Sequence, residues 1–328
     1  MARSSSPGCV CQKSNAATRL HVPDITIQAL ANDVHTHDDL AKLDAAAGTQ
    51  GLKQCQIPII NIPTSLSGGE YSPGAGATDT RDHHKVGFTH PSMGAELIIL
   101  DPALSISTPA RIWLSTGMRA VDHCVEELCS LDHRVTDETD GYAAKGLSML
   151  VPSLLETKMN WEAEGPRLTE MMGVIEAMKS MSTGVPMGGS HAIGHQLGPL
   201  GVGHGETSCI MLPAVLKYNY EHGNEEVKGR QKRVLDVLWR EEMVAKMLTE
   251  KGLEKGKADA GDVLDAVIKE LGMPRTLNEM GVKREQLDAL AVNCLKDRWL
   301  KTNPVPLTTK EQVLEILEMV VGDEKSSL

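Results

Sequence analysis

Ala95-Glu96-Leu97-Ile98-Ile99-Leu100-Asp101-Pro102 is the last strand-like stretch before the character of the chain changes, at about Pro109. Its apolar run, stopped by a proline, predicts a β-strand, and continuous runs of this kind are typical of buried parallel strands. An earlier run at Gln56–Pro63 predicts a second buried strand, followed by a loop rich in Gly, Ser and Thr at Thr64–Gly76. With a short helix at Asp38–Ala47, these elements predict a small α/β region.

Beyond Pro109 the apolar residues recur at helical spacing, and strand-like runs are rare. The run Cys209–Leu212 is compatible with either a strand or a helix. We therefore expect a fold of the α/β plus all-α class, with a disordered N-terminus at 1–24, a partial α/β nucleotide-binding domain at 25–108 and a helical domain at 109–328. The helices predicted in the last part are Ala110–Leu131, Asp137–Glu156, Glu170–Ser182, Val234–Lys251, Ala260–Leu271, Arg284–Asn293 and Lys310–Val321.

The composition excludes several classes of protein. The 328 residues carry a formal net charge of −11, and nucleic-acid binding requires Lys and Arg to neutralise phosphates. The one modest basic run, Lys228–Arg233, is bracketed by acidic residues and is expected to be a solvated helix face. No stretch approaches the roughly 20 apolar residues of a membrane span. Seven cysteines lack the spacing of a disulfide framework, which predicts reduced thiols and a cytoplasmic protein.

Several candidate catalytic and metal-binding residues lie in the segment Gly188–Glu206, which is rich in glycine and contains three histidines. His191 and His195 are four residues apart, so both project from one face of a helix. His204 follows a glycine-rich turn that can fold it back towards them. Arg119 and His123 form a similar pair earlier in the chain. Histidines at this spacing also arise by chance, but three imidazoles with an open position make a good site for zinc or iron.

Four separated segments together resemble the iron-containing alcohol dehydrogenase superfamily, and more closely its maleylacetate reductase branch. The resemblance implies a dinucleotide-binding α/β domain followed by an all-helical domain, a dehydroquinate synthase-like architecture. It also implies hydride transfer between a nicotinamide cofactor, NAD(P), and a small-molecule substrate, with a homodimer as a plausible assembly. The matching segments are Ile62–Glu70, Asp101–Pro102 with Gly117–Glu126, His191–His204, and Thr302–Leu307 followed by Val313–Leu317.

The resemblance also carries residue roles. His123, His191 and His204 match three metal ligands of the family, for iron or zinc, and His195 matches a histidine that relays a proton to the substrate oxygen. These four histidines and Arg119 are therefore the predicted catalytic residues. The predicted cofactor-binding residues are Thr64, Ser65, Gly68, Gly69, Asp39 and Lys42.

The sequence departs from the family pattern at two places. Arg119 stands at the position of the family's aspartate ligand, and a guanidinium cannot bind a dication. We expect Asp122 to be paired or to lie behind the ligands. For Arg119, the alternative to a functional role is a structural one, a surface or interface salt bridge with Asp122 or Glu126. The second departure is Asp33-Val34-His35-Thr36, which stands where the family has a glycine-rich phosphate loop. About half of the nucleotide domain upstream is expected to be missing, through a wrongly assigned start or through genuine loss.

Three functions follow from these observations. The first is a metal-independent NAD(P)H-dependent reductase of a small oxo- or unsaturated carboxylic acid, in which Arg119 supplies positive charge. The second is a metal-dependent alcohol dehydrogenase that uses His123, His191 and His204. The third is a non-catalytic remnant that binds no cofactor, which the missing glycines favour. Metal content separates the first two, and cofactor binding tests the third.

Overall fold

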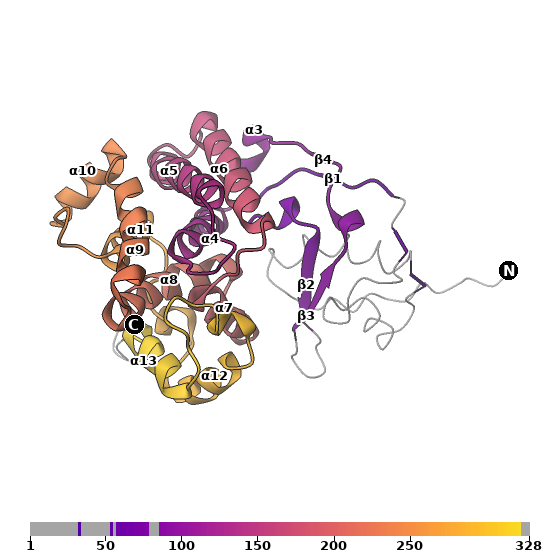
Figure 1. Cartoon of the computed structure of the whole chain (residues 1–328). Helices are drawn as coiled ribbons and strands as arrows, with labels where there is room; N and C mark the ends of the chain where they lie inside the picture. The colour runs from indigo at the N-terminus through magenta and orange to yellow at the C-terminus, as the bar shows by residue number, and fades with distance from the viewer. Residues whose placement is uncertain (1–31, 34–52, 55–56, 79–84, 323–328) are drawn as a thin grey trace. The chain divides into compact units, whose positions relative to one another are not determined.

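The computed structural model describes residues 32–33, 53–54, 57–78 and 85–322 (Figure 1). The chain divides into two compact units, one made of residues 1–57 and 73–93 and the other of residues 58–72 and 94–328. Each unit is described by itself. The predicted disordered segment 1–24, the predicted helix at Asp38–Ala47, and Asp39 and Lys42 lie outside the described residues.

The described part of the first unit contains an antiparallel hairpin that the sequence analysis did not predict. Strand β2, Gly74–Thr78, pairs with β3, Lys85–Thr89, in a register that opposes Gly74 to Thr89. The 3-10 turn η4, Pro91–Met93, follows. The expected loop at Thr64–Gly76 is therefore wrong at its end, because β2 begins at Gly74. The strand was missed because its small residues give no alternating apolar signal and it depends on pairing with β3.

The second unit begins with two short parallel strands. Strand β1, Ile60–Asn61, pairs with β4, Leu97–Ile98, with Ile60 opposite Leu97. The two predicted strands are therefore confirmed in position, but their expected burial is wrong. Ile60 is 58% exposed and Leu97 is 51% exposed. A continuous apolar run predicts a strand without specifying which element covers it.

Helices make up the rest of the second unit (Figure 1). Their N-termini are held by side-chain caps where the sequence supplies Asp, Thr or Asn: Asp101, Thr136, Asn224, Asp259 and Thr309 each accept a backbone N–H of the first turn. The α-helices are α3 Pro102–Ser105, α4 Ala110–Cys129, α5 Asp137–Met159, α6 Glu164–Ser182, α7 Gly189–Leu197, α8 His204–His222, α9 Glu225–Leu238, α10 Glu242–Glu250, α11 Ala260–Leu271, α12 Leu287–Cys294 and α13 Lys310–Val320. The 3-10 turns are η3 Gly69–Tyr71, η5 Gly198–Leu200, η6 Asn278–Met280, η7 Arg284–Gln286 and η8 Arg298–Leu300.

Most predicted helices are confirmed, and the errors lie at breaks between helices. The predicted helix Val234–Lys251 is two helices, because the chain turns between Leu238 and Glu242. The expectation of a solvated basic face at Lys228–Arg233 is also wrong at two residues, since Gln231 is 1% exposed and Arg230 is bound to an acidic partner. Arg230 donates to both carboxylate oxygens of Asp140, at 2.6 and 2.8 Å, and its side chain is only 12% exposed. No helix of the described chain is long and apolar enough to cross a membrane.

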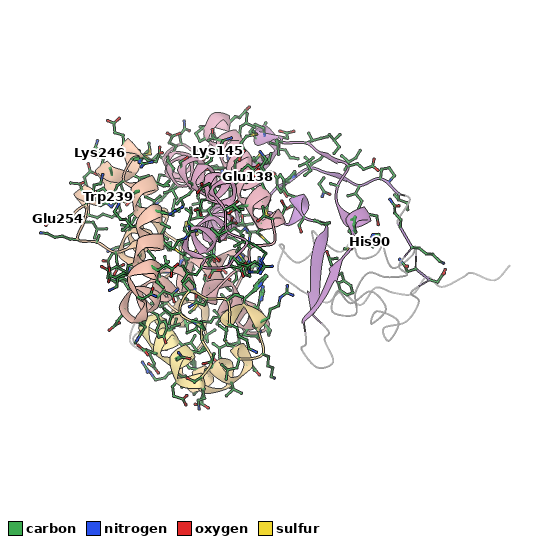
Figure 2. All side chains as sticks on the ribbon, in the orientation of Figure 1. His90, Glu138, Lys145, Trp239, Lys246 and Glu254 are labelled. Atoms are coloured by element: carbon green, nitrogen blue, oxygen red, sulfur yellow. The ribbon has the colours of Figure 1, made fainter. Side chains whose placement is uncertain are left out.

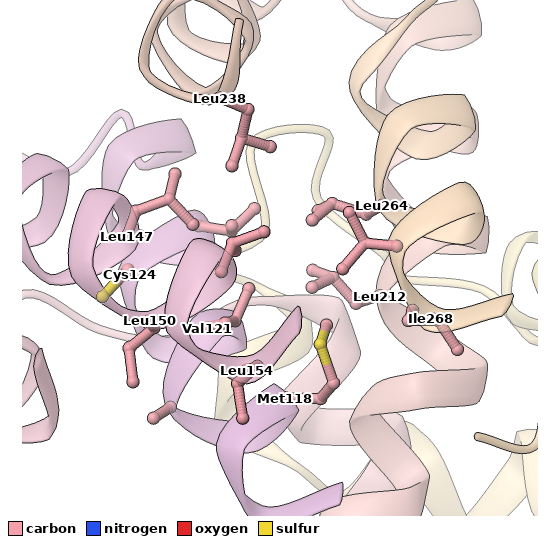
Figure 3. Close-up of a cluster of buried hydrophobic side chains, with 14 of the residues drawn as sticks. Met118, Val121, Cys124, Leu147, Leu150, Leu154, Leu212, Leu238, Leu264 and Ile268 are labelled. Atoms are coloured by element: carbon pink, nitrogen blue, oxygen red, sulfur yellow. The ribbon is translucent and has the colours of Figure 1, made fainter. Parts of the chain in front are cut away.

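The main core lies where α4, α5, α8, α9 and α11 meet, and Figure 3 shows their side chains converging from separate helices. Glycine permits a close contact between two helices: a Cβ at Gly205 of α8 would lie 2.5 Å from the carbonyl carbon of Ser115 in α4. This close approach brings the start of α8 against the middle of α4. The labelled core residues are Met118, Val121, Cys124, Leu147, Leu150, Leu154, Leu212, Leu238, Leu264 and Ile268.

A second hydrophobic cluster joins α7 and α8 to α12 and α13. Ile193 of α7 and Leu300 of η8 are both buried in it. Many charged side chains lie on the outside of the unit, as the labelled Lys246 and Glu254 show in Figure 2. Helix α7 is therefore fixed between the second cluster and α4, and that placement builds the site.

Candidate functional site

The centre of the site is a buried polar cluster between α4, α7 and the start of α8. Helix α4 contributes Arg119, Asp122, His123 and Glu126, whose spacing of three and four residues puts them on one stripe of the helix. Helix α7 contributes His191. Each of these five side chains belongs to a residue that is at most 7% exposed. Charges are rarely buried without a partner, so the contacts of this cluster decide its chemistry.

Glu126 is held by the N-terminus of α7. Its Oε2 accepts the N–H of Gly188 at 2.7 Å and lies 2.8 Å from His191 Nδ1, while its Oε1 accepts the N–H of Ser190 at 2.7 Å. A helix N-terminus favours an anion. Burial raises the pKa of Glu126 to about 8, with a further contribution from the charge of Asp122, and the two backbone N–H groups oppose the shift.

Asp122 and Arg119 form the charged pair of the cluster. Asp122 Oδ2 lies 3.8 Å from Arg119 Nη1 and accepts the hydroxyls of Ser190 at 2.7 Å and Ser208 at 2.6 Å. Ser208 Oγ in turn accepts Arg119 Nη1 at 3.1 Å. Burial raises the pKa of Asp122 to about 6, and Arg119 and the two hydroxyls oppose it. The alternative of a surface salt bridge at Arg119 is wrong, because Arg119 is 2% exposed.

His123 and His191 are neutral members of the cluster. Their rings stack with centroids 4.7 Å apart. Burial, and then the charge of Arg119, lowers the pKa of His123 to about 3 and holds that of His191 well below its ordinary value. Within this cluster, four buried polar atoms have no hydrogen-bond partner among the described residues: Arg119 Nε, Asp122 Oδ1, His123 Nδ1 and His191 Nε2. A buried polar atom without a partner is costly, so these atoms point to a role beyond packing.

The other two predicted histidines have different surroundings. His195 is in the last turn of α7; its side chain is 16% exposed, and its Nδ1 lies 2.8 Å from Asp297 Oδ2. The ring of Trp299 is 5.1 Å from that of His195. His204 is the first residue of α8 and is exposed. The sequence analysis missed both Asp297 and Trp299, although the segment Thr302–Leu307 that it singled out begins just after them.

The predicted cofactor loop, Thr64–Gly69, follows the carboxyl end of the parallel strand β1. It is tied to the helices by its main chain, since Leu66 N–H donates to Thr116 Oγ1 and Thr108 Oγ1 donates to the carbonyl of Thr64. Gly68 has a φ of +84°, and a Cβ there would lie 2.5 Å from Met178 Sδ. Ser65 and Ser67 place their hydroxyls 3.3 Å apart. The role of this loop in binding a dinucleotide stays a prediction.

The family resemblance implies a divalent metal, and the contacts test whether one fits. The predicted set His123, His191 and His204 does not bring its ligand atoms together in the described structure. Among the described residues, two groups place three potential ligand atoms within 4.8 Å of one another: buried Asp122, Glu126 and His191, and exposed Glu221, His222 and Glu315.

The buried group does not fit a divalent cation. Both oxygens of Glu126 and Oδ2 of Asp122 already accept hydrogen bonds, and His191 Nδ1 is engaged with Glu126. Arg119 is 3.8 Å from Asp122 and cannot lose its proton. A dication would therefore meet a fixed cation, and Asp122 Oδ1 is the one carboxylate oxygen of this group without a hydrogen bond from a described residue. The guanidinium is the cation of this cluster.

The second unit thus combines two short parallel strands with a helical domain that carries the buried polar cluster. The chain belongs to the Fe-containing alcohol dehydrogenase family, whose C-terminal part matches residues 113–321. Among curated proteins, it is 42% identical over 323 residues to the dehydrogenase ALT3 of Alternaria alternata, covering 94% of this chain and 81% of that protein.

Solved structures share the fold. Maleylacetate reductase from Rhizobium sp. strain MTP-10005 has a TM-score of 0.65 at 24% identity, over 80% of this chain and 67% of that one. Sulfoacetaldehyde reductase from Bifidobacterium kashiwanohense, solved in complex with NAD+, has a TM-score of 0.70 at 20% identity, over 92% of this chain and 75% of that one. Membership of the family and its named dehydrogenase relative make the chain an oxidoreductase homologue.

Proposed function

We propose that the chain is a metal-independent, NAD(P)H-dependent reductase of a small oxo- or unsaturated carboxylic acid. The observation that carries the proposal is the buried guanidinium of Arg119, which stands inside the polar cluster with its Nε unpartnered by any described residue. A solved relative of the same fold is named as an NAD+ complex, which supports the cofactor. Thr64, Ser65, Gly68 and Gly69 are the proposed cofactor contacts among the described residues.

The charge of Arg119 suits a substrate whose oxygen becomes negative during reduction. Reduced nicotinamide, when bound, supplies the hydride to the substrate carbon, and the substrate oxygen, or the neighbouring carbon of a conjugated acid, then needs one proton. A fixed cation stabilises the developing negative charge without reorganisation, and loss of one such donor typically costs about 100- to 1,000-fold in kcat. Ser208 and Asp122 hold the guanidinium in place through the contacts described above.

The proton is assigned to His195. His123 and His191 are poor donors, because burial and Arg119 keep both rings neutral at pH 7. His195 is partly exposed and lies beside a carboxylate, and imidazole is the side chain that ordinarily exchanges protons near neutral pH. His123 and His191 instead present neutral ring nitrogens, at His123 Nδ1 and His191 Nε2, that orient the substrate by hydrogen bonds.

Cofactor binding is the first test. The full chain is titrated with NADH and with NADPH while the cofactor fluorescence is followed. Saturable binding to either cofactor is expected, together with a rise in melting temperature, because a ligand that binds only the native state stabilises it. Folded protein that binds neither cofactor would overturn the proposal and favour the non-catalytic remnant.

Metal content separates the proposal from a metal-dependent alcohol dehydrogenase. That second function is favoured by one observation, the closeness of the ligand atoms of Asp122, Glu126 and His191. Elemental analysis of the active enzyme is expected to find far less than one equivalent of iron or zinc. Activity that disappears on chelation and returns with one added equivalent of metal would establish the second function instead.

We also propose that the chain forms a homodimer and that it is located in the cytosol. Cys124, Cys129, Cys209 and Cys294 are free and buried in the described structure, which suits a reducing compartment. Light scattering of the purified chain and fractionation of source cells test these two points.

A further inference from the structure

A short turn far from α7 in the sequence holds His195. Asp297 caps η8, since its Oδ1 accepts the N–H of Trp299 at 2.9 Å, and its Oδ2 lies 2.8 Å from His195 Nδ1. One carboxylate thus binds a main-chain amide through one oxygen and an imidazole through the other. The carboxylate cannot rotate without losing the cap, so the direction of the bond to His195 is fixed.

The turn itself is anchored on both sides. Leu300 is 1% exposed in the second hydrophobic cluster, and its carbonyl accepts the N–H of Leu307 at 2.9 Å. Thr302 Oγ1 donates to the carbonyl of Met187, just before α7, at 2.7 Å. The turn and the start of α7 therefore form one assembly, and Asp297 is held rigidly with respect to His195.

Trp299 packs against the same histidine. Its ring centroid lies 5.1 Å from that of His195 and 6.0 Å from that of His191, edge-on to the latter. The N–H of Trp299 is the group that Asp297 caps, so the carboxylate that orients His195 also places the ring beside it. The orientation of the His195 ring is therefore constrained by this one turn.

Another histidine–carboxylate pair shows what a plain surface contact looks like in this chain. His222 Nε2 lies 2.6 Å from Glu315 Oε1, but the two side chains are 39% and 45% exposed. Those of His195 and Asp297 are 16% and 12% exposed. Partial burial, a second anchor on the carboxylate and a packed indole distinguish the His195 pair from an exposed ion pair.

We propose that Asp297 is the positioning residue that keeps the Nδ1 proton on His195 and makes Nε2 the atom that exchanges a proton with the substrate. The inference rests on the proposed function, in which His195 supplies the proton. In the reduction, hydride adds to the substrate carbon, the Nε2–H bond of the imidazolium breaks, and its proton goes to the substrate oxygen. His195 is left neutral with Nδ1–H still donated to Asp297, which stays ionised throughout.

Three variants of the full chain test the proposal by kinetics. Asp297→Asn keeps the size of the side chain but removes the charge, Asp297→Glu restores a carboxylate, and Asp288→Asn is a matched control. Asp288 is an exposed carboxylate that pairs with Lys310. Asp297→Asn is expected to lower kcat by about 10- to 100-fold with little change in KM. Asp297→Glu is expected to recover part of the loss, and the control to match the parent enzyme. An unchanged kcat in Asp297→Asn overturns the proposal.

A measurement that needs no activity distinguishes this inference from the proposed function. Nitrogen-15 NMR of the histidine rings at alkaline pH, with His195 assigned from the His195→Gln variant, reports its tautomer directly. The Nδ1–H form is expected in the parent and a mixture of tautomers in Asp297→Asn. An Nε2–H form in the parent, or no change in the variant, overturns the role of Asp297. Absence of reductase activity from a parent with the Nδ1–H form overturns the proposed function alone.

Discussion

Replacing Arg119 with methionine removes the only cation within the buried cluster while roughly preserving its volume. Asp122 would then keep its bonds to Ser190 and Ser208 but lose the guanidinium 3.8 Å away. Breaking a buried pair by removing one partner typically costs about 3–5 kcal/mol, because it leaves an uncompensated buried charge. The two hydroxyl donors offset part of that cost, so we expect the free energy of unfolding to fall by about 3 kcal/mol near pH 8.

The fall in the free energy of unfolding caused by Arg119→Met is expected to depend on pH. Burial raises the pKa of Asp122 from 3.8 to about 6, so between these values the native state holds a proton that the unfolded state has lost. Protonation of Asp122 therefore stabilises the native state at low pH. This stabilisation is lost as the pH rises through the pKa that Asp122 has in the folded protein. Arg119 opposes this rise in pKa. Without Arg119, the pKa of Asp122 moves higher, and protonation relieves the unpaired charge at a higher pH.

The assay is urea unfolding followed by circular dichroism at about pH 8 and about pH 5, for Arg119→Met, Asp122→Asn and the double variant. The penalty of Arg119→Met is expected to shrink at the lower pH. The double variant is expected to regain most of the loss, because removing both partners leaves neither charge of the pair buried alone. A loss below about 1 kcal/mol at pH 8, or a double variant no more stable than Arg119→Met, would refute the pairing of Arg119 with Asp122.

Three further predictions concern turnover, packing and metal. His195→Ala is expected to lower kcat by roughly 100- to 10,000-fold with an unchanged melting temperature; a parent-like rate in stopped-flow assays removes His195 from the reaction. Gly205→Ala is expected to destabilise the protein by more than about 2 kcal/mol in urea, since its Cβ would lie 2.5 Å from Ser115; equal stability would contradict the close crossing of α4 and α8. Dialysis against a strong chelator is expected to leave the rate constant unaltered, and a rate that tracks bound zinc or iron would contradict the role of Arg119.

Local signals predicted the helical part of the chain well. Helix α11 has the predicted bounds Ala260–Leu271 because Asp259 caps its start and Gly272, with a φ of +71°, ends it. Both features are visible in the sequence. The hairpin β2–β3 was missed because its strands are specified by pairing with each other rather than by an apolar pattern.

The site was predicted only in part. The spacing of His191 and His195 correctly predicted one helix, but their partners come from different elements. His191 meets Glu126 of α4, 65 residues away, and His195 meets Asp297, 102 residues away. No periodicity encodes contacts over such separations, so Asp297 and Trp299 could not be found from residue spacing alone.

These long separations in sequence also delay the formation of the contacts while the chain is synthesised on the ribosome. Gly189 donates its N–H to the buried side chain of Asn303, and Asn303 follows it by 114 residues. At about 5–20 residues per second, the ribosome needs roughly 6–23 s to span that distance. During this interval α4, α5 and α6 are available to pack, whereas the start of α7 still lacks the hydrogen bond from Gly189 to Asn303. A translational arrest before Asn303 would therefore leave a chain with a formed hydrophobic core and an incomplete candidate site.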